Sequence, residues 1–520
     1  MDQSRRKRFK LLTATLFLCF LQLRGIFDPI RSAEKTTPAV LGQQQSDIGE
    51  WQKAITHFDK AIASSPYDSS LLARRGYAYA NLGKYKKAFQ DFDIAIKCDT
   101  NNPDAYTLRA RAHAWLGLGA LSKEDAKKSL ALTKLIDQKN PRLMMERAGN
   151  LMINQNLKEG YEEYKKVLAL VHGKKDLPSL IIAMRAHSTR HEDAKALKLA
   201  DQALKIAPHS QLPKIIKSSI HVEQHYSGLA LKELKSIDAN NLANTLHHSM
   251  IGTCYYYLDD NPKALEAFNL AIKLEPKNAY ALTMRGKTYH YMGDYKKAID
   301  SMSSAINLDS SDPQRYIDRS DNYGHEKDWK NALADAEKAI LTDPKFSNAY
   351  VQKGLALHNL KRDSEAAIAY EKGVEVDPNN PTAFFNRGMH FRENKEYRKA
   401  IDDLTKAIKL NPANAIYYCA RGSAYVSDFK YEHAIYDCSR SLKLNSRRTH
   451  PHFSRGIAFA KLGDYKSAIR DFNEAIRQYP DYGEAYYERG LIYKTLQLKN
   501  KSKSDLDKAE KLGHKSPEAM

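Results

Sequence analysis

The sequence is poor in the features that would assign it to an enzyme or to a disulfide-rich protein. Among 520 residues there are only 18 prolines and 24 glycines, which leaves little room for long linkers. Five cysteines occur without a CxxC pair, which argues against both a disulfide framework and a zinc cluster of cysteines. The motifs GxxxxGKS/T, GxSxG, HExxH and GxGxxG are absent, and no strand pattern is present. The sequence therefore predicts neither catalysis nor a cofactor.

A fixed period organises most of the chain. A residue that is usually glycine, and otherwise mostly small, recurs every thirty-four positions, and we call it the anchor residue of each copy. The anchor residues are Gly42, Gly76, Ala110, Ala148, Met184, Ser218, Gly252, Gly286, Ser320, Gly354, Gly388, Gly422, Gly456 and Gly490. The spacing widens by four positions before Ala148 and by two before Met184. The chain thus contains about fourteen copies, of which those between residues 118 and 217 are the least regular.

Each copy has the pattern of two helices joined by a tight turn. Alanine stands twelve positions after most anchor residues, and a bulkier apolar residue such as Phe268 or Phe472 stands four positions further on. Apolar spacings of three and four predict helices. Glycine in turns such as residues 462–465 can end the first helix, and a proline twenty-four positions after seven of the anchor residues ends the second. One such hairpin has too small a core to fold alone, so the copies must stack.

This pattern resembles the tetratricopeptide repeat family over about residues 38–512. Residues 455–465, with the sequence RGIAFAKLGDY, carry the family pattern almost unaltered, whereas Met184 and Ser218 depart from it. The resemblance implies an all-α solenoid of about fourteen helix–turn–helix repeats that forms a right-handed superhelix. It also implies a non-catalytic scaffold or adaptor that binds partner proteins. We expect an export or membrane segment at 1–33, N-terminal repeats at 34–135, irregular repeats at 136–237, a regular array at 238–512 and a tail at 513–520, with a hinge in the irregular repeats.

Arginine directly precedes the anchor residue in nine copies, and a net charge of +20 would allow these arginines to be read as a phosphate-binding ladder. In these copies a carboxylate stands fifteen positions after the anchor residue at Asp91, Glu163, Asp335, Asp403, Asp437, Asp471 and Asp505. The copy with Lys353 in place of arginine has Ala369 at that position. Because guanidinium groups suit carboxylates at partly buried sites, we predict an ion pair between the two helices of each copy instead of a phosphate site.

The resemblance implies that the first helix of each repeat lines a concave surface. Residues three before and one after the anchor residue should then face that surface. In the C-terminal copies these residues, which we call the apolar strip, are Val351, Leu355, Phe385, Met389, Phe453, Ile457, Tyr487 and Leu491. Such a strip suits a bound peptide or helix, with Phe385, Phe453 and Tyr487 as the principal contacts. The alternative is that superhelical closure or neighbouring side chains cover these residues.

Four histidines form a second pattern. His187 and His191 are four positions apart, and His221 and His225 repeat this arrangement one full period later. Stacked repeats would bring the four imidazoles together, where they could bind zinc or copper. We favour the alternative that the first of each pair packs where the family often has an aromatic residue or histidine, and that the second lies at a helix end. We therefore assign no metal.

The N-terminus has the form of an export signal. A basic run at residues 5–10 precedes an apolar stretch from Leu11 to Leu23, which is shorter than the roughly 20 residues of a membrane-spanning helix. We expect the protein to be exported, to the periplasm or as a secreted protein, or to be attached to a membrane through residues 11–23. A cytoplasmic location is the less favoured alternative.

The basic excess is spread along the whole chain. Lysine and arginine number 82 against 62 aspartates and glutamates, without one dominant basic patch. This distribution indicates a solvated face. Binding of RNA or of an anionic surface is the alternative function, but we do not expect nucleic acid to be the partner because the predicted strip is apolar.

Overall fold

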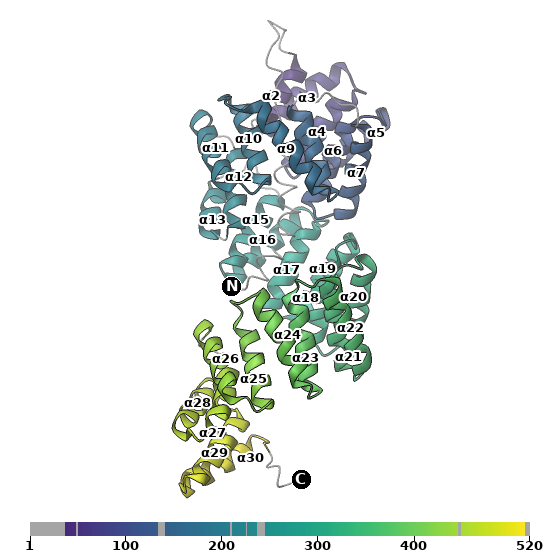
Figure 1. The fold of residues 1–520 in the computed structure, drawn as a ribbon. Helices are drawn as coiled ribbons and strands as arrows, with labels where there is room; N and C mark the ends of the chain where they lie inside the picture. Colours follow the sequence, from purple (N-terminus) through teal and green to yellow (C-terminus); the bar gives the residue numbers. More distant parts are fainter. Residues whose placement is uncertain are drawn as a thin grey trace. The chain divides into compact units, whose positions relative to one another are not determined.

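A computed structural model describes residues 37–47, 50–133, 141–208, 211–224, 226–236, 245–445 and 449–514. Within these ranges the chain forms 28 helices and no strands, so the predicted all-α class is confirmed (Figure 1). The apolar stretch 11–23 and the end of the tail lie outside the described residues. The described residues form two compact units, one up to Lys327 and one from Asp328, which we call the N-terminal and C-terminal units. The domain boundaries and the hinge drawn from the sequence stay predictions.

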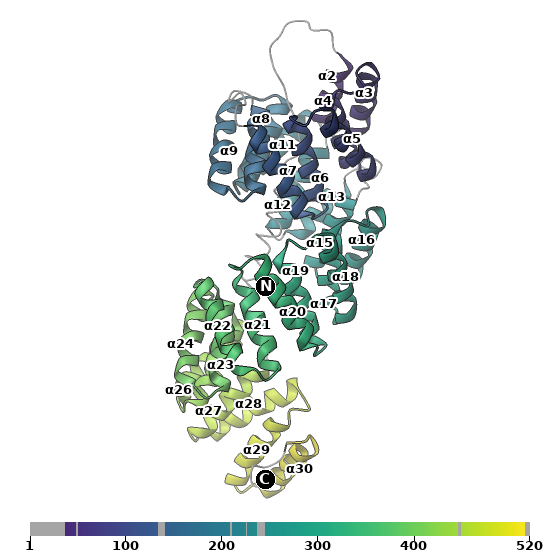
Figure 2. The same cartoon turned by 90° about the vertical axis from the view of Figure 1, so that its right-hand side faces the viewer.

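The N-terminal unit contains seventeen of the described helices. They are α2 (Pro38–Asp47), α3 (Trp51–Ser64), α4 (Ser69–Asn81), α5 (Tyr85–Cys98), α6 (Pro103–Trp115), α7 (Gly119–Leu132), α8 (Pro141–Ile153), α9 (Leu157–Val171), α10 (Leu177–Thr189), α11 (Asp193–Ile206), α12 (Gln211–Glu223), α13 (Ser227–Lys235), α15 (Thr245–Tyr257), α16 (Asn261–Leu274), α17 (Ala279–Tyr291), α18 (Tyr295–Leu308) and α19 (Pro313–His325). Up to α18, consecutive helices pack in pairs as antiparallel hairpins, one for each predicted copy (Figure 2).

The C-terminal unit contains eleven described helices. They are α20 (Trp329–Thr342), α21 (Ser347–Asn359), α22 (Asp363–Val376), α23 (Pro381–Glu393), α24 (Tyr397–Leu410), α25 (Ala415–Ser427), α26 (Tyr431–Leu444), α27 (Thr449–Lys461), α28 (Tyr465–Gln478), α29 (Gly483–Thr495) and α30 (Lys499–Lys511). From α21 onward they pair as five further hairpins. The ninth copy contributes α19 to one unit and α20 to the other.

The small anchor residue makes room for the ring that faces it from the second helix. A Cβ atom added to Gly354 would lie 2.6 Å from Tyr370, and one added to Gly456 would lie 2.8 Å from Phe472. Both rings are buried. The small anchor residue therefore lets the two helices of a copy approach each other closely.

In the twelve copies whose turn lies within the described residues, the turn inside the hairpin uses one left-handed residue, seven positions after the anchor residue. Glycine occupies it in four copies, as at Gly117 and Gly463, but other copies have residues such as Lys361 or Phe429 with φ near +60°. Glycine tolerates this conformation without steric cost, whereas other residues adopt it with strain. The predicted glycine cap is thus correct for part of the array only. The other copies adopt the same backbone geometry with a residue that is not glycine.

The N-terminal unit closes on itself between copies that are far apart in the sequence. The turn between α6 and α7 meets α17 and the start of α19: Gly119 N donates to Asp309 Oδ2 at 2.9 Å, and Arg315 donates to the Gly117 carbonyl at 2.8 Å. Tyr280 N donates to the Leu116 carbonyl at 3.4 Å. We call these hydrogen bonds the closing contact.

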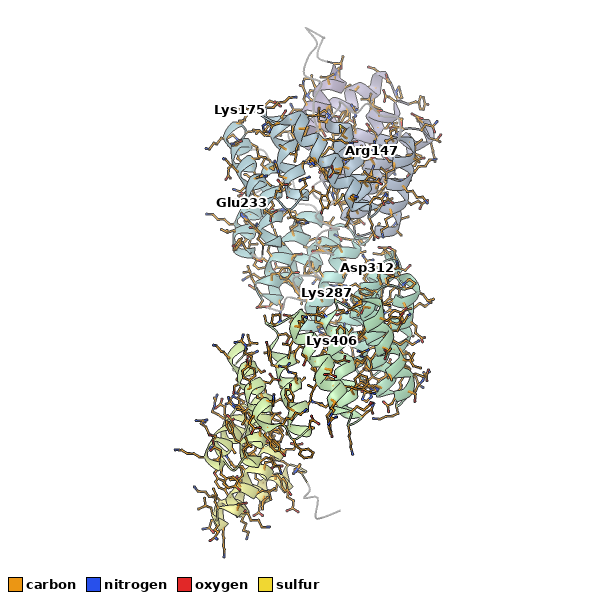
Figure 3. The ribbon with its side chains drawn as sticks, in the orientation of Figure 1. Arg147, Lys175, Glu233, Lys287, Asp312 and Lys406 are labelled. Atoms are coloured by element: carbon orange, nitrogen blue, oxygen red, sulfur yellow. The ribbon has the colours of Figure 1, made fainter. Side chains whose placement is uncertain are left out.

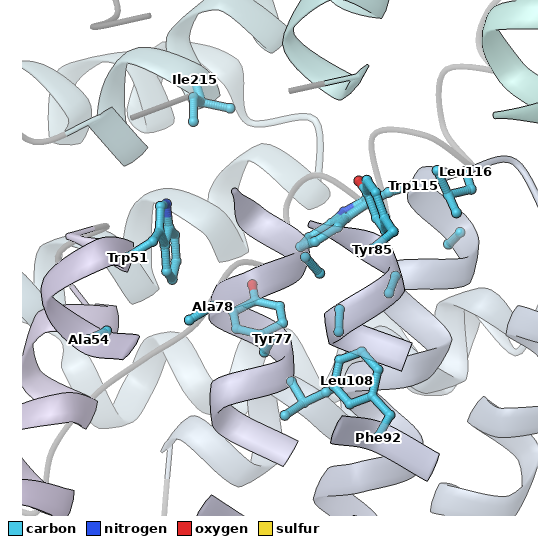
Figure 4. Close-up of a cluster of buried hydrophobic side chains, with 14 of the residues drawn as sticks. Trp51, Ala54, Tyr77, Ala78, Tyr85, Phe92, Leu108, Trp115, Leu116 and Ile215 are labelled. Carbon is cyan, nitrogen blue, oxygen red and sulfur yellow. The ribbon is translucent and has the colours of Figure 1, made fainter. Parts of the chain in front are cut away.

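The largest apolar cluster among the described residues of this unit connects copies that are far apart in the sequence. It joins Trp51 and Tyr77 of the first copies to Ile215 of the sixth and Cys254 of the seventh (Figure 4). The Tyr77 ring packs against Trp51 at 5.8 Å and against Trp115 at 5.6 Å between ring centroids. The inner face of the N-terminal unit is therefore filled by its own side chains.

Candidate functional site

The two units differ in how they use the positions three before and one after the anchor residue. In the N-terminal unit most of these positions are buried, and they include Ala73, Tyr77, Thr107, Arg111, Met145, Ile181, Arg185, Ile215, Ser219, Thr253 and Thr283. In the C-terminal unit Val351 is buried at 5% exposure, but the other seven residues of the apolar strip are only partly buried. In the N-terminal unit the protein's own side chains therefore cover these positions. In the C-terminal unit most residues of the apolar strip remain accessible to solvent.

Neighbouring helices hold the aromatic rings of the strip in place. Phe385 on α23 packs against Tyr417 of the next first helix at 5.2 Å, and Phe453 on α27 packs against Tyr482 at 4.8 Å. Tyr487 on α29 lies 4.7 Å from the His514 ring. Rings fixed in this way lose little conformational entropy when a ligand packs on them. The role of the eight strip residues in binding stays a prediction.

Three aromatic side chains outside the strip are more exposed than any residue in it. Phe429 in the turn between α25 and α26 is 77% exposed, Tyr436 on α26 is 69% exposed, and Tyr479 is 54% exposed. The period did not single them out, because it marks the packing positions of each copy and not the solvent-facing ones. They provide a matched set for testing the strip.

The arginine before the anchor residue forms the predicted ion pair in six of the seven predicted copies, and the Arg319–Asp335 pair stays a prediction. In six copies Nε and Nη2 donate to the two oxygens of an aspartate on the second helix, at 2.7 to 2.9 Å: Arg75–Asp91, Arg109–Asp125, Arg387–Asp403, Arg421–Asp437, Arg455–Asp471 and Arg489–Asp505. The Arg147–Glu163 pair is looser, at 3.8 Å. The pair at Asp125 has the same spacing but was absent from the predicted set.

The same arginine also contacts the preceding copy, which the sequence analysis did not predict. Its Nη1 reaches the residue 16 positions earlier, as in Arg75 to Asp59 at 2.9 Å, Arg421 to Thr405 at 3.0 Å and Arg455 to Ser439 at 2.9 Å. The partner changes from carboxylate to hydroxyl, so no single residue type marks it in the sequence. The guanidinium groups are thus occupied by protein partners within and between copies, and the structural interpretation of the arginines is confirmed.

Comparison with known families decides the identity of the fold. Models described as tetratricopeptide repeat match residues 40–103, 267–300, 347–380, 381–414 and 483–512, and one described as TPR repeat matches 456–497. The chain is a tetratricopeptide repeat protein. These matches fall on copies in both units, as the period of the sequence predicts.

Solved tetratricopeptide repeat structures resemble this protein over parts of its length. The APC/C hetero-tetramer Cut9–Hcn1 is 13% identical, with 85% of this chain and 95% of that chain covered and a TM-score of 0.44. A tetratricopeptide repeat protein from Parabacteroides merdae is 19% identical (48% and 98% covered, TM-score 0.39). YrrB, a TPR protein with an unusual peptide-binding site, is 24% identical (34% and 91% covered, TM-score 0.30). No curated protein sequence matches this repeat protein.

The histidines predicted as metal candidates lie apart from the metal-competent groups of the described repeats. His187 Nδ1 contacts Glu192 at 2.8 Å, and His191 is the left-handed residue that ends its helix. Burial lowers the pKa of His221, and His225 lies outside the described residues. Among the described residues, the two groups of three potential ligands are His290, Asp321 and His325, and His358, Asp363 and His390. Neither includes His187, His191 or His221.

Among the described helices of this repeat protein, none is both long and apolar enough to span a membrane. Charged side chains such as Lys175, Glu233 and Lys406 occur along both units (Figure 3).

We expect acid to weaken this repeat protein through its buried aspartates. Burial alone would raise the pKa of Asp471, but hydrogen bonds from Arg455 and His452 outweigh burial and lower it below the ordinary value of 3.8. Since the folded pKa is the lower one, the stabilisation is complete above about pH 4 and is lost as the pH falls through the folded pKa. Urea unfolding between pH 6 and 2.5 should show a falling midpoint, with a shallower fall in Asp471→Asn. Equal slopes in the two proteins would contradict this assignment.

Proposed function

We propose that the C-terminal unit binds a segment of a partner protein along the apolar strip, and that the chain is a non-catalytic scaffold. The observation that carries this proposal is the difference between the units. The positions three before and one after the anchor residue are mostly buried in the N-terminal unit. The equivalent residues of the C-terminal unit, among them Phe385, Phe453 and Tyr487, are partly exposed. Aromatic side chains dominate the energy of most protein interfaces. The segment expected to bind is a peptide or helix with apolar side chains at regular spacing.

RNA or an anionic surface is the alternative partner of different chemistry. The +20 net charge supports it, but six of the arginines that repeat along the chain already pair bidentately with aspartates. The remaining lysines are distributed along the chain. A capture experiment distinguishes the two, because a complex held by RNA is lost on nuclease treatment and on raising the salt concentration.

The test compares two triple variants. In one, Phe385, Phe453 and Tyr487 are changed to alanine; in the other, the exposed Phe429, Tyr436 and Tyr479 are changed to alanine. We expect the first to bind partner protein at least about a hundredfold more weakly and the second to bind like the parent, since three aromatic contacts that the partner buries, at about 1–2 kcal/mol each, add to at least about 3 kcal/mol. Affinity is measured on the captured partner, and circular dichroism verifies the helical content of each variant.

Two further measurements keep the test decisive. Because the strip rings also pack against neighbouring helices, Leu355→Glu with Leu491→Glu places charges on the strip while leaving the rings intact. A photo-crosslinking residue at position 491 should react with the partner, and one at position 436 should not. Equal binding by all variants, or crosslinking only from position 436, would contradict the proposal.

A further inference from the structure

Three side chains from successive helices of the C-terminal unit form a compact group. His358 lies near the end of α21, Asp363 is the first residue of α22, and His390 lies on α23. Each offers one nitrogen or oxygen atom, and these atoms lie within 4.8 Å of one another. The group has no role in the arginine pairs or in the apolar strip, so neither of those functions explains it.

The stacking of copies explains how the group assembles. His358 stands four positions after the anchor residue Gly354, and His390 stands two after Gly388, so adjacent first helices bring their rings to 5.9 Å between centroids. Asp363 opens the second helix between them, and its Oδ1 lies 2.7 Å from His358 Nδ1. Three separate backbone segments therefore meet at this point.

His390 is the most informative member of the group. It is 5% exposed, and its Nδ1 has no hydrogen-bond partner among the described residues. Its Nε2 contacts the Asn394 side-chain amide at 3.1 Å, and the buried Tyr370 ring lies 5.4 Å away. A buried polar nitrogen is normally satisfied. With the Asn394 amide turned so that its oxygen accepts from Nε2–H, Nδ1 is the nitrogen that remains to bind an ion.

His358 shows the complementary arrangement. Its Nδ1 faces Asp363, and its Nε2 lies 3.2 Å from Glu393 Oε2. Histidines that bind a metal through one ring nitrogen commonly give the other N–H to a carboxylate, which fixes the ring and its tautomer. In both imidazoles of this group a neighbouring side chain contacts Nε2. This leaves Nδ1 as the ligand atom of each ring.

We propose that His358, Asp363 and His390 bind a divalent zinc ion. Imidazole nitrogen and carboxylate oxygen are zinc ligands at about 2.0–2.2 Å, which places tetrahedral ligands about 3.3 Å apart. The atoms of this group lie within 4.8 Å of one another, so they must move closer together to bind one ion. Three protein ligands leave a fourth position for water, and Glu393 and Asn394 orient the two imidazoles. Bound zinc would connect α21, α22 and α23 next to Met389.

The second group of potential ligands supplies an internal control. His290, Asp321 and His325 in the N-terminal unit are all more exposed than His390. His290 Nδ1 contacts Asn322 at 3.0 Å, and the His325 ring stacks on Tyr295 at 4.2 Å. His290 Nε2 lies 3.8 Å from Asp321, which is itself a member of the group, and no carboxylate outside the group is paired with either histidine among the described residues. We therefore expect this group to bind zinc much more weakly.

The test is titration of the full chain, freed of metal by a chelator, with Zn²⁺ in a calorimeter and with Co²⁺ as a spectroscopic probe. We expect one saturable zinc equivalent and visible d–d absorption from Co²⁺ bound by imidazole and carboxylate. His358→Gln and His390→Gln should each weaken zinc at least tenfold and abolish the absorption. Glu393→Ala, which removes a positioning residue, should weaken zinc about tenfold. His290→Gln should bind like the parent.

Thermal unfolding keeps the test valid if the buried His390→Gln substitution perturbs folding. Zinc should raise the melting temperature of the parent and of His290→Gln but not that of His358→Gln, whose side chain is only partly buried. Several results would overturn the proposal: no saturable zinc binding by the parent, unchanged binding by His358→Gln, or loss of binding in His290→Gln instead.

Discussion

We expect the Arg421→Ala variant to lose about 3 kcal/mol of stability in the C-terminal unit, at the lower end of the range for breaking a buried ion pair. Arg421 donates to both oxygens of Asp437 at 2.7 and 2.8 Å. The Asp437 side chain is 1% exposed, so removing the arginine leaves a carboxylate in the protein interior. The guanidinium itself is 15% exposed, which is why the lower end of the range applies.

The chain offers a matched control for this substitution at the equivalent position of another copy. Lys353 faces Ala369 inside its own hairpin, and its Nζ pairs with the exposed Glu337 of the preceding copy at 2.9 Å. Lys353→Ala should therefore cost only about 0–1 kcal/mol. Repeat arrays need not unfold in one step, so urea unfolding should be combined with hydrogen exchange of α25 and α26. Equal losses in the two variants would contradict a role for the buried pair.

The fold could be predicted from the sequence because each copy repeats the same local contacts. The anchor glycine, the ring sixteen positions later and the arginine–carboxylate pair all join residues within one hairpin. A contact that recurs in most copies produces a periodic pattern of residue types in the sequence, even when individual copies depart from it. The contact of the arginine with the preceding copy leaves a weaker trace, because Asp59, Thr405 and Ser439 all accept the same hydrogen bond.

The closing contact and the filling of the N-terminal unit could not be predicted in this way. They join residues such as Gly117 and Arg315, which are 198 positions apart, and they occur once. The sequence alone therefore left open whether the concave positions were covered or exposed. The structure gives a different outcome for each unit, since Tyr77 is fully buried while Phe385 is not.

The histidine groups show that a site built from several copies is equally difficult to predict from the sequence. His187 and His221 occupy equivalent positions of adjacent copies, so the period of the sequence singles them out. The group around His390 uses three different positions of the repeat, and one of them is an aspartate at the start of a second helix. Such a group has no fixed spacing, so only the packing of successive helices reveals it.

We expect Arg315→Ala to open the closing contact and to destabilise the N-terminal unit by about 3–5 kcal/mol. Arg315 donates to the Asp309 carbonyl at 2.6 Å, to the Asp309 carboxylate at 3.1 Å and to the Gly117 carbonyl at 2.8 Å. The side chains of Arg315 and Asp309 are 6% and 4% exposed. Without the guanidinium, the buried Asp309 carboxylate keeps hydrogen bonds from the Gly119 amide and Ser311 but loses its counter-charge.

Hydrogen exchange of the Gly119 amide measures this opening directly, because that N–H donates to Asp309 across the closing contact. Its exchange should accelerate about a hundredfold or more in Arg315→Ala, since each tenfold change corresponds to about 1.4 kcal/mol. Gly117→Ala should act in the same direction by a steric route, because its Cβ would lie 2.8 Å from Tyr280 N and its φ is +71°. Lys297→Ala, which removes an exposed pair with Asp294 in the same unit, should leave the exchange unchanged. If Gly119 stays protected in both Arg315→Ala and Gly117→Ala, the apolar core that includes Trp51, Tyr77 and Ile215 holds the unit closed without the hydrogen bonds of the closing contact.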